Sequence, residues 1–354
     1  MTRASDTAKA RGMLAQLARR HMRPYAGRGV KRGRKLPRLA GSDLVLALAV
    51  VIASCPSSVA QKATASAPDW PRPDASKLPG GPWKDAVLYG RKLILETYSV
   101  VGPEVRIKSM RYAGNNLSCQ SCHLEGGTRQ FGLPLIGVYG VYPAYMGREN
   151  QVRTLEERIN GCFERSMNGH GLPIDSKEMK ALVAYMQFLS TGVPVGASPK
   201  GRGTSTLPLL TRAADPKRGA DVYKKNCASC HQPDGHGQRN GSKGDAKGYL
   251  YPPLWGPDSF NDGAGMHRLI TSASFVHANM PFGTTYKAPA LSNQDAWDVA
   301  AYINDRPRPK RADLNLDYPN RSRKPVDAPF PPFADKFSLA QHRLGPYQPI
   351  LDAH

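Results

Sequence analysis

The sequence lacks a long hydrophobic run and contains few cysteines. Its apolar stretch Leu44–Ala53 has ten residues, too few to cross a bilayer as a helix. Four of the six cysteines fall in two similar motifs, so only Cys55 and Cys162 remain for other roles. Acidic residues are scarce at the N-terminal end, where residues 1–42 hold 12 Lys and Arg but a single acid, Asp6.

The positive charge is therefore uneven along the chain. The formal net charge of +21 divides into +11 for residues 1–42 and +10 for the rest. The sequence has no motif of interleaved aromatic and basic residues, which excludes a nucleic-acid-binding role. The charge that remains suits an anionic small substrate or an acidic redox partner.

Residues 1–55 have the order of an export signal, in which a basic segment precedes a short apolar core. The sequence Ile-Ala-Ser-Cys at 52–55 resembles a bacterial lipobox, which predicts cleavage before Cys55 and acylation of its thiol. Ordinary cleavage nearby is the alternative. Both routes predict a periplasmic protein, lipid-anchored to the membrane in the first case. Residues 56–82 are rich in Ala, Ser and Pro and are predicted to form a flexible tether.

The pattern Cys-x-x-Cys-His occurs twice, at 119–123 and 227–231. In this pattern the two thiols attach covalently to haem vinyl groups, and the His supplies one axial bond to iron. A redox dithiol or half of a zinc site is the alternative, but no further Cys/His pair completes a zinc site. The sequence therefore predicts two covalently bound haem c groups. The attachment residues are Cys119, Cys122 and His123 for haem 1, and Cys227, Cys230 and His231 for haem 2.

Helical patterns divide the rest of the chain into two similar units. Residues 83–192 and 215–305 each have a helical pattern before the haem motif and another at their end, and a Pro- and Gly-rich linker, 193–214, joins them. This order resembles class I cytochromes c. The predicted fold is therefore mostly α, with two class I cytochrome c-like domains. Residues 306–354 are Pro-rich with little helical pattern and are predicted to form an extended C-terminal arm.

In such domains the first and last helices cross where a small residue meets an aromatic one. Gly90 against Tyr185 suits the first domain. Gly219 against Trp297 or Tyr302 suits the second.

Helix starts are marked by capping residues. Thr154, with Glu157 three residues later, predicts a short helix over 154–163. Asp175 is the predicted N-cap of a longer helix over 175–189.

The second axial ligand of haem 2 is predicted to be Met280. It lies in a Pro/Gly loop before the last helix, where class I cytochromes place a methionine, and a thioether ligand raises the reduction potential. Met266, His267 and His277 are the alternatives.

Cys162 is predicted to be the second axial ligand of haem 1. It stands before the last helix of its domain, as Met280 does in the other. A buried free cysteine that only packs is the alternative. A thiolate on iron leaves a soft, nucleophilic sulfur, which suits chemistry on another sulfur better than simple electron transfer. Arginine forks suit sulfur oxyanions, and the neighbouring basic and hydroxyl residues are Arg148, Arg153, Arg158, Arg165, Ser166 and His170. A solvated face, in which the arginines pair with Glu149, Glu156, Glu157 and Glu164, is the alternative.

Two stretches resemble the dihaem thiosulfate dehydrogenases of the TsdA type. They are Arg-Ile-Asn-Gly-Cys-Phe-Glu-Arg-Ser-Met-Asn-Gly at 158–169 and Tyr-Pro-Pro-Leu-Trp-Gly-Pro-Asp-Ser-Phe-Asn at 251–261. The resemblance runs from about residue 83 to the C-terminal arm. It implies a first domain similar to the SoxA cytochromes. It also implies axial ligation of haem 1 by His123 and Cys162, with catalytic roles for Cys162, Arg148, Arg158 and Ser166.

The resemblance also implies an activity. The family couples two thiosulfates to tetrathionate, in some members reversibly, and electrons pass from haem 1 to haem 2 and then to an external acceptor such as a small cytochrome c or a high-potential redox protein. Two positions depart from the family pattern. His170 stands where Lys is frequent, and Asn279 precedes Met280 where some members have Lys, which favours simple His/Met ligation of haem 2.

Two other functions fit the same motifs. One is a dihaem electron carrier without a substrate of its own. The other is a SoxA-like sulfur-oxidation subunit, which would need a partner cytochrome, whereas this chain has its own second haem motif.

Overall fold

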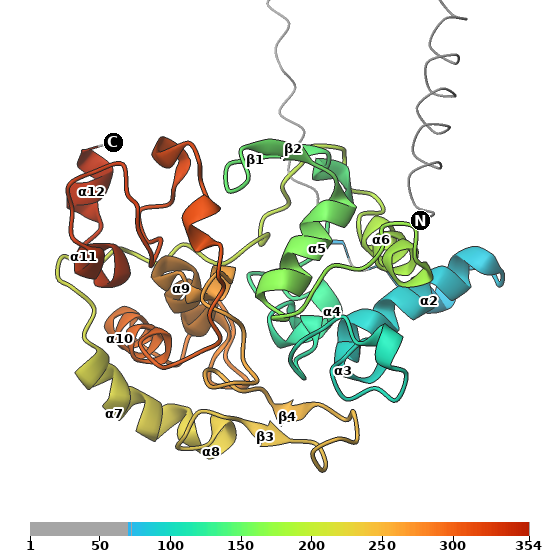
Figure 1. The fold of residues 1–354 in the computed structure, drawn as a ribbon, viewed down its shortest axis with the longest axis horizontal. Helices are drawn as coiled ribbons and strands as arrows, with labels where there is room; N and C mark the ends of the chain where they lie inside the picture. Colours follow the sequence, from blue (N-terminus) through green and yellow to red (C-terminus); the bar gives the residue numbers. More distant parts are fainter. Residues whose placement is uncertain (1–69, 72, 354) are drawn as a thin grey trace, which may run out of the picture. The chain divides into compact units, whose positions relative to one another are not determined.

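The structure is a computed structural model that describes residues 70–71 and 73–353. The predicted export signal, Cys55 and most of the predicted tether lie outside these residues. Helices are the main regular elements of the described residues, and the strands form two antiparallel two-stranded ribbons (Figure 1). None of the helices described is long and apolar enough to cross a membrane.

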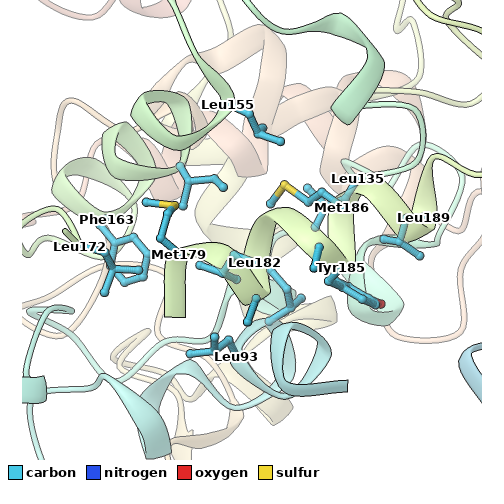
Figure 2. Packing of buried hydrophobic residues seen from close by; sticks show 14 of the residues in the cluster. Leu93, Leu135, Leu155, Phe163, Leu172, Met179, Leu182, Tyr185, Met186 and Leu189 are labelled. Carbon is cyan, nitrogen blue, oxygen red and sulfur yellow. The ribbon is translucent and has the colours of Figure 1, made fainter. Parts of the chain in front are cut away.

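The first domain is centred on the crossing of α2 (Pro82–Leu95) and α6 (Lys177–Leu189). A Cβ atom at Gly90 would collide with the backbone oxygen of Ala181 and lie 2.7 Å from Cβ of Tyr185, so only glycine permits this approach. The predicted Gly90–Tyr185 crossing is confirmed. Figure 2 shows the buried side chains of α6 packed between α2 and α5 (Leu155–Arg165).

Short elements complete this domain around the haem motif. They are η1 (Ala75–Lys77), α3 (Thr97–Val100), η2 (Lys108–Met110), η3 (Cys119–Ser121), α4 (Leu124–Gly127), η4 (Tyr139–Val141), and the ribbon of β1 (Ala144–Met146) and β2 (Gln151–Arg153), which pairs Ala144 with Arg153.

The capping residues define α5 as predicted and α6 differently. Thr154 and Glu157 form the capping box of α5. In α6 the N-cap is Ser176 and not Asp175, because the Ser176 hydroxyl accepts the backbone N–H of Met179 at 3.1 Å.

The second domain repeats the crossing with α7 (Pro216–Asn226) and α10 (Asn293–Asn304). A Cβ atom at Gly219 would collide with the backbone oxygen of Asp298 and lie 2.9 Å from Cβ of Tyr302. Of the two aromatic partners proposed from the sequence, Tyr302 is therefore the one at the crossing. The other elements are α8 (Ala228–His231), β3 (Gln238–Arg239), β4 (Tyr249–Tyr251), η5 (Gly265–His267) and α9 (Leu269–Asn279).

The C-terminal arm has more structure than its sequence pattern predicted. It contains η6 (Leu314–Leu316), η7 (Arg321–Arg323), α11 (Leu339–Leu344) and α12 (Gln348–Asp352). Tyr347 and Ile350 are buried in the second hydrophobic core, and the Tyr347 ring lies 5.9 Å from that of Trp297. These helices are only five or six residues long, and tertiary packing stabilises them where propensity alone would not.

The predicted tether also packs in part. Trp70 Nε1 donates to Thr128 O at 2.9 Å, and the side chains of Trp70, Ala75 and Leu78 contact the first core. Packing against the first core therefore includes residues before residue 83.

Candidate functional site

The first haem motif is anchored by α3. The backbone N–H of Cys119 donates to Thr97 Oγ1 at 3.0 Å. Nδ1 of His123 lies 2.5 Å from Leu133 O, which orients the ring and leaves Nε2 free for a metal, as is typical of iron-binding histidines. Burial lowers the pKa of His123 and so favours the neutral ring that can bind iron.

A cavity of about 250 Å³ lies next to this motif. Cys119, Cys122 and His123 line it together with Cys162 of α5. This donor set fits a c-type haem, with two thiols for attachment, one imidazole ligand and one sulfur that can serve as the second ligand. The ligand role of Cys162 stays a prediction. The apolar part of the wall includes Ile94, Leu117, Leu135, Ile159, Phe163, Leu182 and Met186.

Arg158 and Cys162 lie one helical turn apart on α5 and are in contact. The guanidinium Nη1 of Arg158 lies 2.9 Å from Cys162 Sγ. The electrostatic interaction with Cys162 raises the pKa of Arg158. The pair therefore places a fixed positive charge beside the sulfur.

A second cavity, of about 790 Å³, shares part of its wall with the first. Arg158, Cys162 and Ser166 line both cavities, so they stand where the two spaces meet. Arg148 lines only the second cavity. The structure thus brings together all four residues to which the sequence assigned catalytic roles. The C-terminal arm supplies a further part of this wall, with Arg311, Asp313, Leu316, Asp317, Tyr318 and Arg323.

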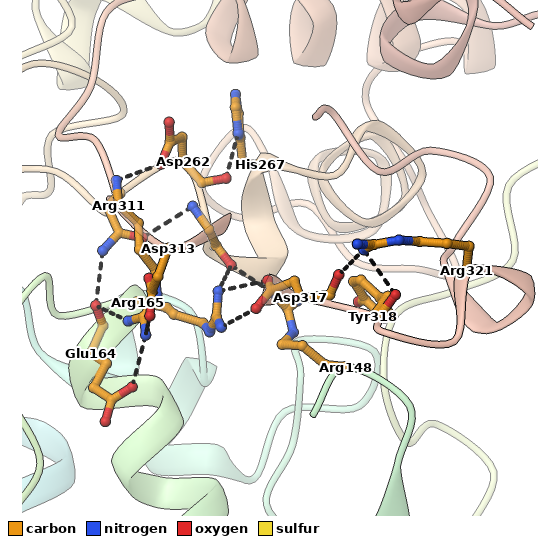
Figure 3. A network of polar contacts seen from close by, with 12 residues as sticks. Arg148, Glu164, Arg165, Asp262, His267, Arg311, Asp313, Asp317, Tyr318 and Arg321 are labelled. Atoms are coloured by element: carbon orange, nitrogen blue, oxygen red, sulfur yellow. Dashed lines mark hydrogen bonds and ion pairs between the residues drawn. The ribbon is translucent and has the colours of Figure 1, made fainter. Parts of the chain in front are cut away.

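Asp317 is the main residue of this site that the sequence did not single out. Its carboxylate accepts hydrogen bonds from Arg148 at 2.8 Å and from Arg165 at 2.6 Å and 2.9 Å. Figure 3 shows both arginines converging on this carboxylate. Burial lowers the pKa of Arg165, although the ion pair with Asp317 opposes this effect. The expected cluster of anion-binding arginines is therefore partly neutralised by a carboxylate from the arm.

The other two candidates differ from each other. Arg153, the last residue of β2, lines the second cavity and pairs with Glu157 at 2.9 Å. The ring of His170 packs against Tyr112, with 5.1 Å between ring centroids, and does not line either of the two cavities.

The second haem motif has the same proximal geometry as the first. Nδ1 of His231 donates to Pro252 O at 2.8 Å, and burial lowers the pKa of His231. Met280 directly follows α9 and packs against the second core. The residues present therefore fit a second c-type haem attached at Cys227 and Cys230.

One alternative ligand of haem 2, His267, has backbone carbonyl oxygens close to both of its ring nitrogens. Nδ1 of His267 lies 2.9 Å from Asp262 O, and Nε2 lies 3.2 Å from Asn304 O. The neutral ring has one N–H and can donate a hydrogen bond to only one of these carbonyls. Met280 remains the predicted ligand, with Met266, His267 and His277 as alternatives.

Comparison with known proteins agrees with this architecture. A family model described as SoxA/TsdA, cytochrome c domain, matches residues 110–195, and the cytochrome c model matches residues 216–306. The thiosulfate dehydrogenase of Stutzerimonas stutzeri (strain A1501) is 41% identical over 238 residues, which are 67% of this chain and 72% of that protein. The chain belongs to the thiosulfate dehydrogenase family. It is a c-type cytochrome with two cytochrome c domains, which hold two covalently bound haems.

Other relatives support the same assignment. The thiosulfate dehydrogenase of Allochromatium vinosum is 41% identical over 242 residues, covering 67% of this chain and 83% of that protein. The solved structure of thiosulfate dehydrogenase (TsdBA) from Marichromatium purpuratum superposes with a TM-score of 0.61 at 38% identity. That match covers 68% of this chain and 50% of the other, so the chain spans half the length of that solved protein.

Proposed function

We propose that this protein is a thiosulfate dehydrogenase that joins two thiosulfate dianions through their sulfane sulfurs. One tetrathionate dianion forms and two electrons leave. The observation that carries the proposal is the contact of 2.9 Å between Arg158 and Cys162, at the boundary between the haem 1 cavity and the polar cavity. A sulfur ligand with a cation beside it suits reactions of anionic sulfur compounds.

The chain's own residues overcome the repulsion between two dianions. Arg158 offers its charge at the sulfur, and Ser166 can donate a hydrogen bond to a sulfonate oxygen in the same region. Arg148 contributes charge farther out, where Asp317 limits how strongly it holds an anion. Because Arg148 shares its charge with Asp317, it attracts thiosulfate but does not hold the tetrathionate dianion so strongly that release is prevented.

The proposed iron ligands differ between the two domains. His123 and Cys162 would hold the iron of haem 1, and His231 and Met280 that of haem 2. When bound, the haems supply the one-electron redox centres that accept the electrons and pass them to an external acceptor, which we propose is a small cytochrome c or a high-potential redox protein. Cys162 also has the chemistry of a transient covalent partner for one sulfane sulfur.

The proposed location is the periplasm, where the export signal predicted over 1–55 would deliver the chain. Lipid anchoring through Cys55 is part of the same proposal. Metabolic labelling with a radioactive fatty acid tests it, because a Cys55→Ala variant would lose a label that the parent protein carries.

Thiosulfate-dependent reduction of the purified protein tests the function. Without any added enzyme, thiosulfate should reduce both haems and yield one tetrathionate for every two electrons. Haems that stay oxidised with thiosulfate but are reduced by dithionite would identify a carrier without a substrate. The reverse assay, tetrathionate reduction by a low-potential donor, establishes which direction the enzyme favours.

A further inference from the structure

Arg202, in the linker between the two cytochrome domains, lies in the wall of the haem 1 cavity. The side chains of that wall include two basic groups, Arg158 and Arg202, and no carboxylate. Arg158 is engaged by Cys162. The guanidinium of Arg202 has no hydrogen-bond or ion-pair partner within residues 70–71 and 73–353. A half-buried cation facing a largely apolar cavity is costly unless an anion joins it there.

The backbone holds Arg202 firmly at this position. Gly201 O accepts the N–H of Phe131 at 2.6 Å, and Gly203 O accepts that of Leu133 at 3.1 Å. Leu133 also orients the proximal ligand, since its carbonyl oxygen binds Nδ1 of His123. The loop that contains Phe131 and Leu133 therefore binds the linker on both sides of Arg202. The same loop orients the His123 imidazole.

Glycine is required for this contact. Gly201 has φ of +110°, and a Cβ atom there would lie 2.9 Å from Cγ of Gln130. A side chain at 201 would push the linker off the loop and carry Arg202 with it.

We propose that Arg202 binds a propionate carboxylate of haem 1. A c-type haem brings two carboxylates into its site, and a carboxylate in apolar surroundings needs a cation to stay ionised. The planar guanidinium can donate two parallel hydrogen bonds to one carboxylate. Arg158 is then left for Cys162 and for the substrate. The proposal depends on haem attachment alone and not on the proposed substrate.

Loss of this pair has a distinct redox signature. In the parent protein the paired propionate stays ionised through the neutral range. Without Arg202 its pKa rises, so reduction of haem 1 becomes coupled to proton uptake. The unpaired anion also favours the oxidised haem, which carries one more positive charge, and lowers the reduction potential of haem 1.

The experiment compares Arg202→Gln with Lys200→Gln in the dihaem protein. Lys200 is an exposed cation in the same linker and does not line the haem 1 cavity. Each variant is titrated spectroelectrochemically at several pH values, with the two haems resolved by their low-spin EPR signals. We expect a lower, pH-dependent potential of haem 1 in Arg202→Gln only, no change at haem 2, and restoration by Arg202→Lys.

A potential of haem 1 in Arg202→Gln that matches Lys200→Gln at every pH would overturn the proposal. So would an unchanged potential with a raised KM for thiosulfate, because Arg202 would then bind substrate. If Arg202→Gln fails to fold, resonance Raman spectroscopy of Arg202→Lys replaces the titration. The propionate bending band of this variant is compared with that of the parent protein. A shift from the parent band supports the pair, and an identical band contradicts it.

Discussion

Asp317 and Arg148 form an ion pair of 2.8 Å although 169 residues separate them in the sequence. The same carboxylate binds Arg165 of α5. Tyr318 strengthens the junction, since its backbone N–H donates to Arg148 O at 2.7 Å. The C-terminal arm is therefore part of the wall of the polar cavity, and its position determines how much arginine charge reaches that space.

Replacing Asp317 by Asn should destabilise the protein. Removing one partner of a buried ion pair costs about 3–5 kcal/mol, because the other charges stay buried. Thermal denaturation measures the effect. Asp313→Asn is the matched control, since this neighbouring carboxylate is more exposed and, among the residues that the structure describes, forms an ion pair with Arg311 alone. Equal melting temperatures of the two variants would show that Asp317 is not needed to hold the arm.

Replacing Arg158 by Gln should impair thiosulfate oxidation. A hydrogen bond to a charged group contributes about 1.5–3 kcal/mol, so kcat/KM should fall roughly 10- to 150-fold. Steady-state kinetics with an artificial acceptor give this ratio. Arg91→Gln removes the same charge from an exposed position of α2 that lines neither cavity, and it should change kcat/KM less than about threefold. Similar losses in both variants would point to general electrostatics and not to a catalytic Arg158.

Replacing Met280 by Ala should lower the reduction potential of haem 2 and abolish the methionine–iron charge-transfer band. The thioether favours the reduced iron, and its loss removes that preference. Met266→Leu should keep both properties. Near-infrared spectroscopy and redox titration distinguish the two variants, and a band that persists in Met280→Ala would exclude Met280 as the ligand.

Acid should destabilise the second domain through His267. Burial lowers the pKa of His267 from 6.5 to about 4. Between these values the unfolded chain binds a proton that the folded chain does not, so the free energy of unfolding falls as the pH drops. The loss is about 3 kcal/mol in total and is complete near pH 4. Urea denaturation at pH 7 and pH 4.5 measures it. His267→Asn should lose less stability than the parent over this range, whereas His236→Asn, at an exposed position, should behave like the parent.

The sequence predicted the parts of the site that depend on local spacing. The Cys-x-x-Cys-His motifs, Gly90, Gly219, and Arg158 one turn before Cys162 are all readable from a few neighbouring residues. Asp317 and Arg202 were not predicted, because their roles arise only when the arm and the linker fold back onto the first domain. In a polar, Pro- and Gly-rich segment, nothing in the periodicity tells which charged side chain will face a cavity. The sequence did not predict α11 and α12 of the arm for the same reason, because these helices depend on packing of Tyr347 and Ile350 into the second core.

Turnover of the Cys162→Gly variant tests whether the Cys162 sulfur takes part in thiosulfate oxidation. The variant should retain two covalently bound haems, as measured by the pyridine haemochrome assay, because its attachment motifs are intact. Dithionite should still reduce both haems. Thiosulfate oxidation to tetrathionate should be lost in this variant. A variant with both haems and the activity of the parent protein would show that the Cys162 sulfur is not needed for the reaction.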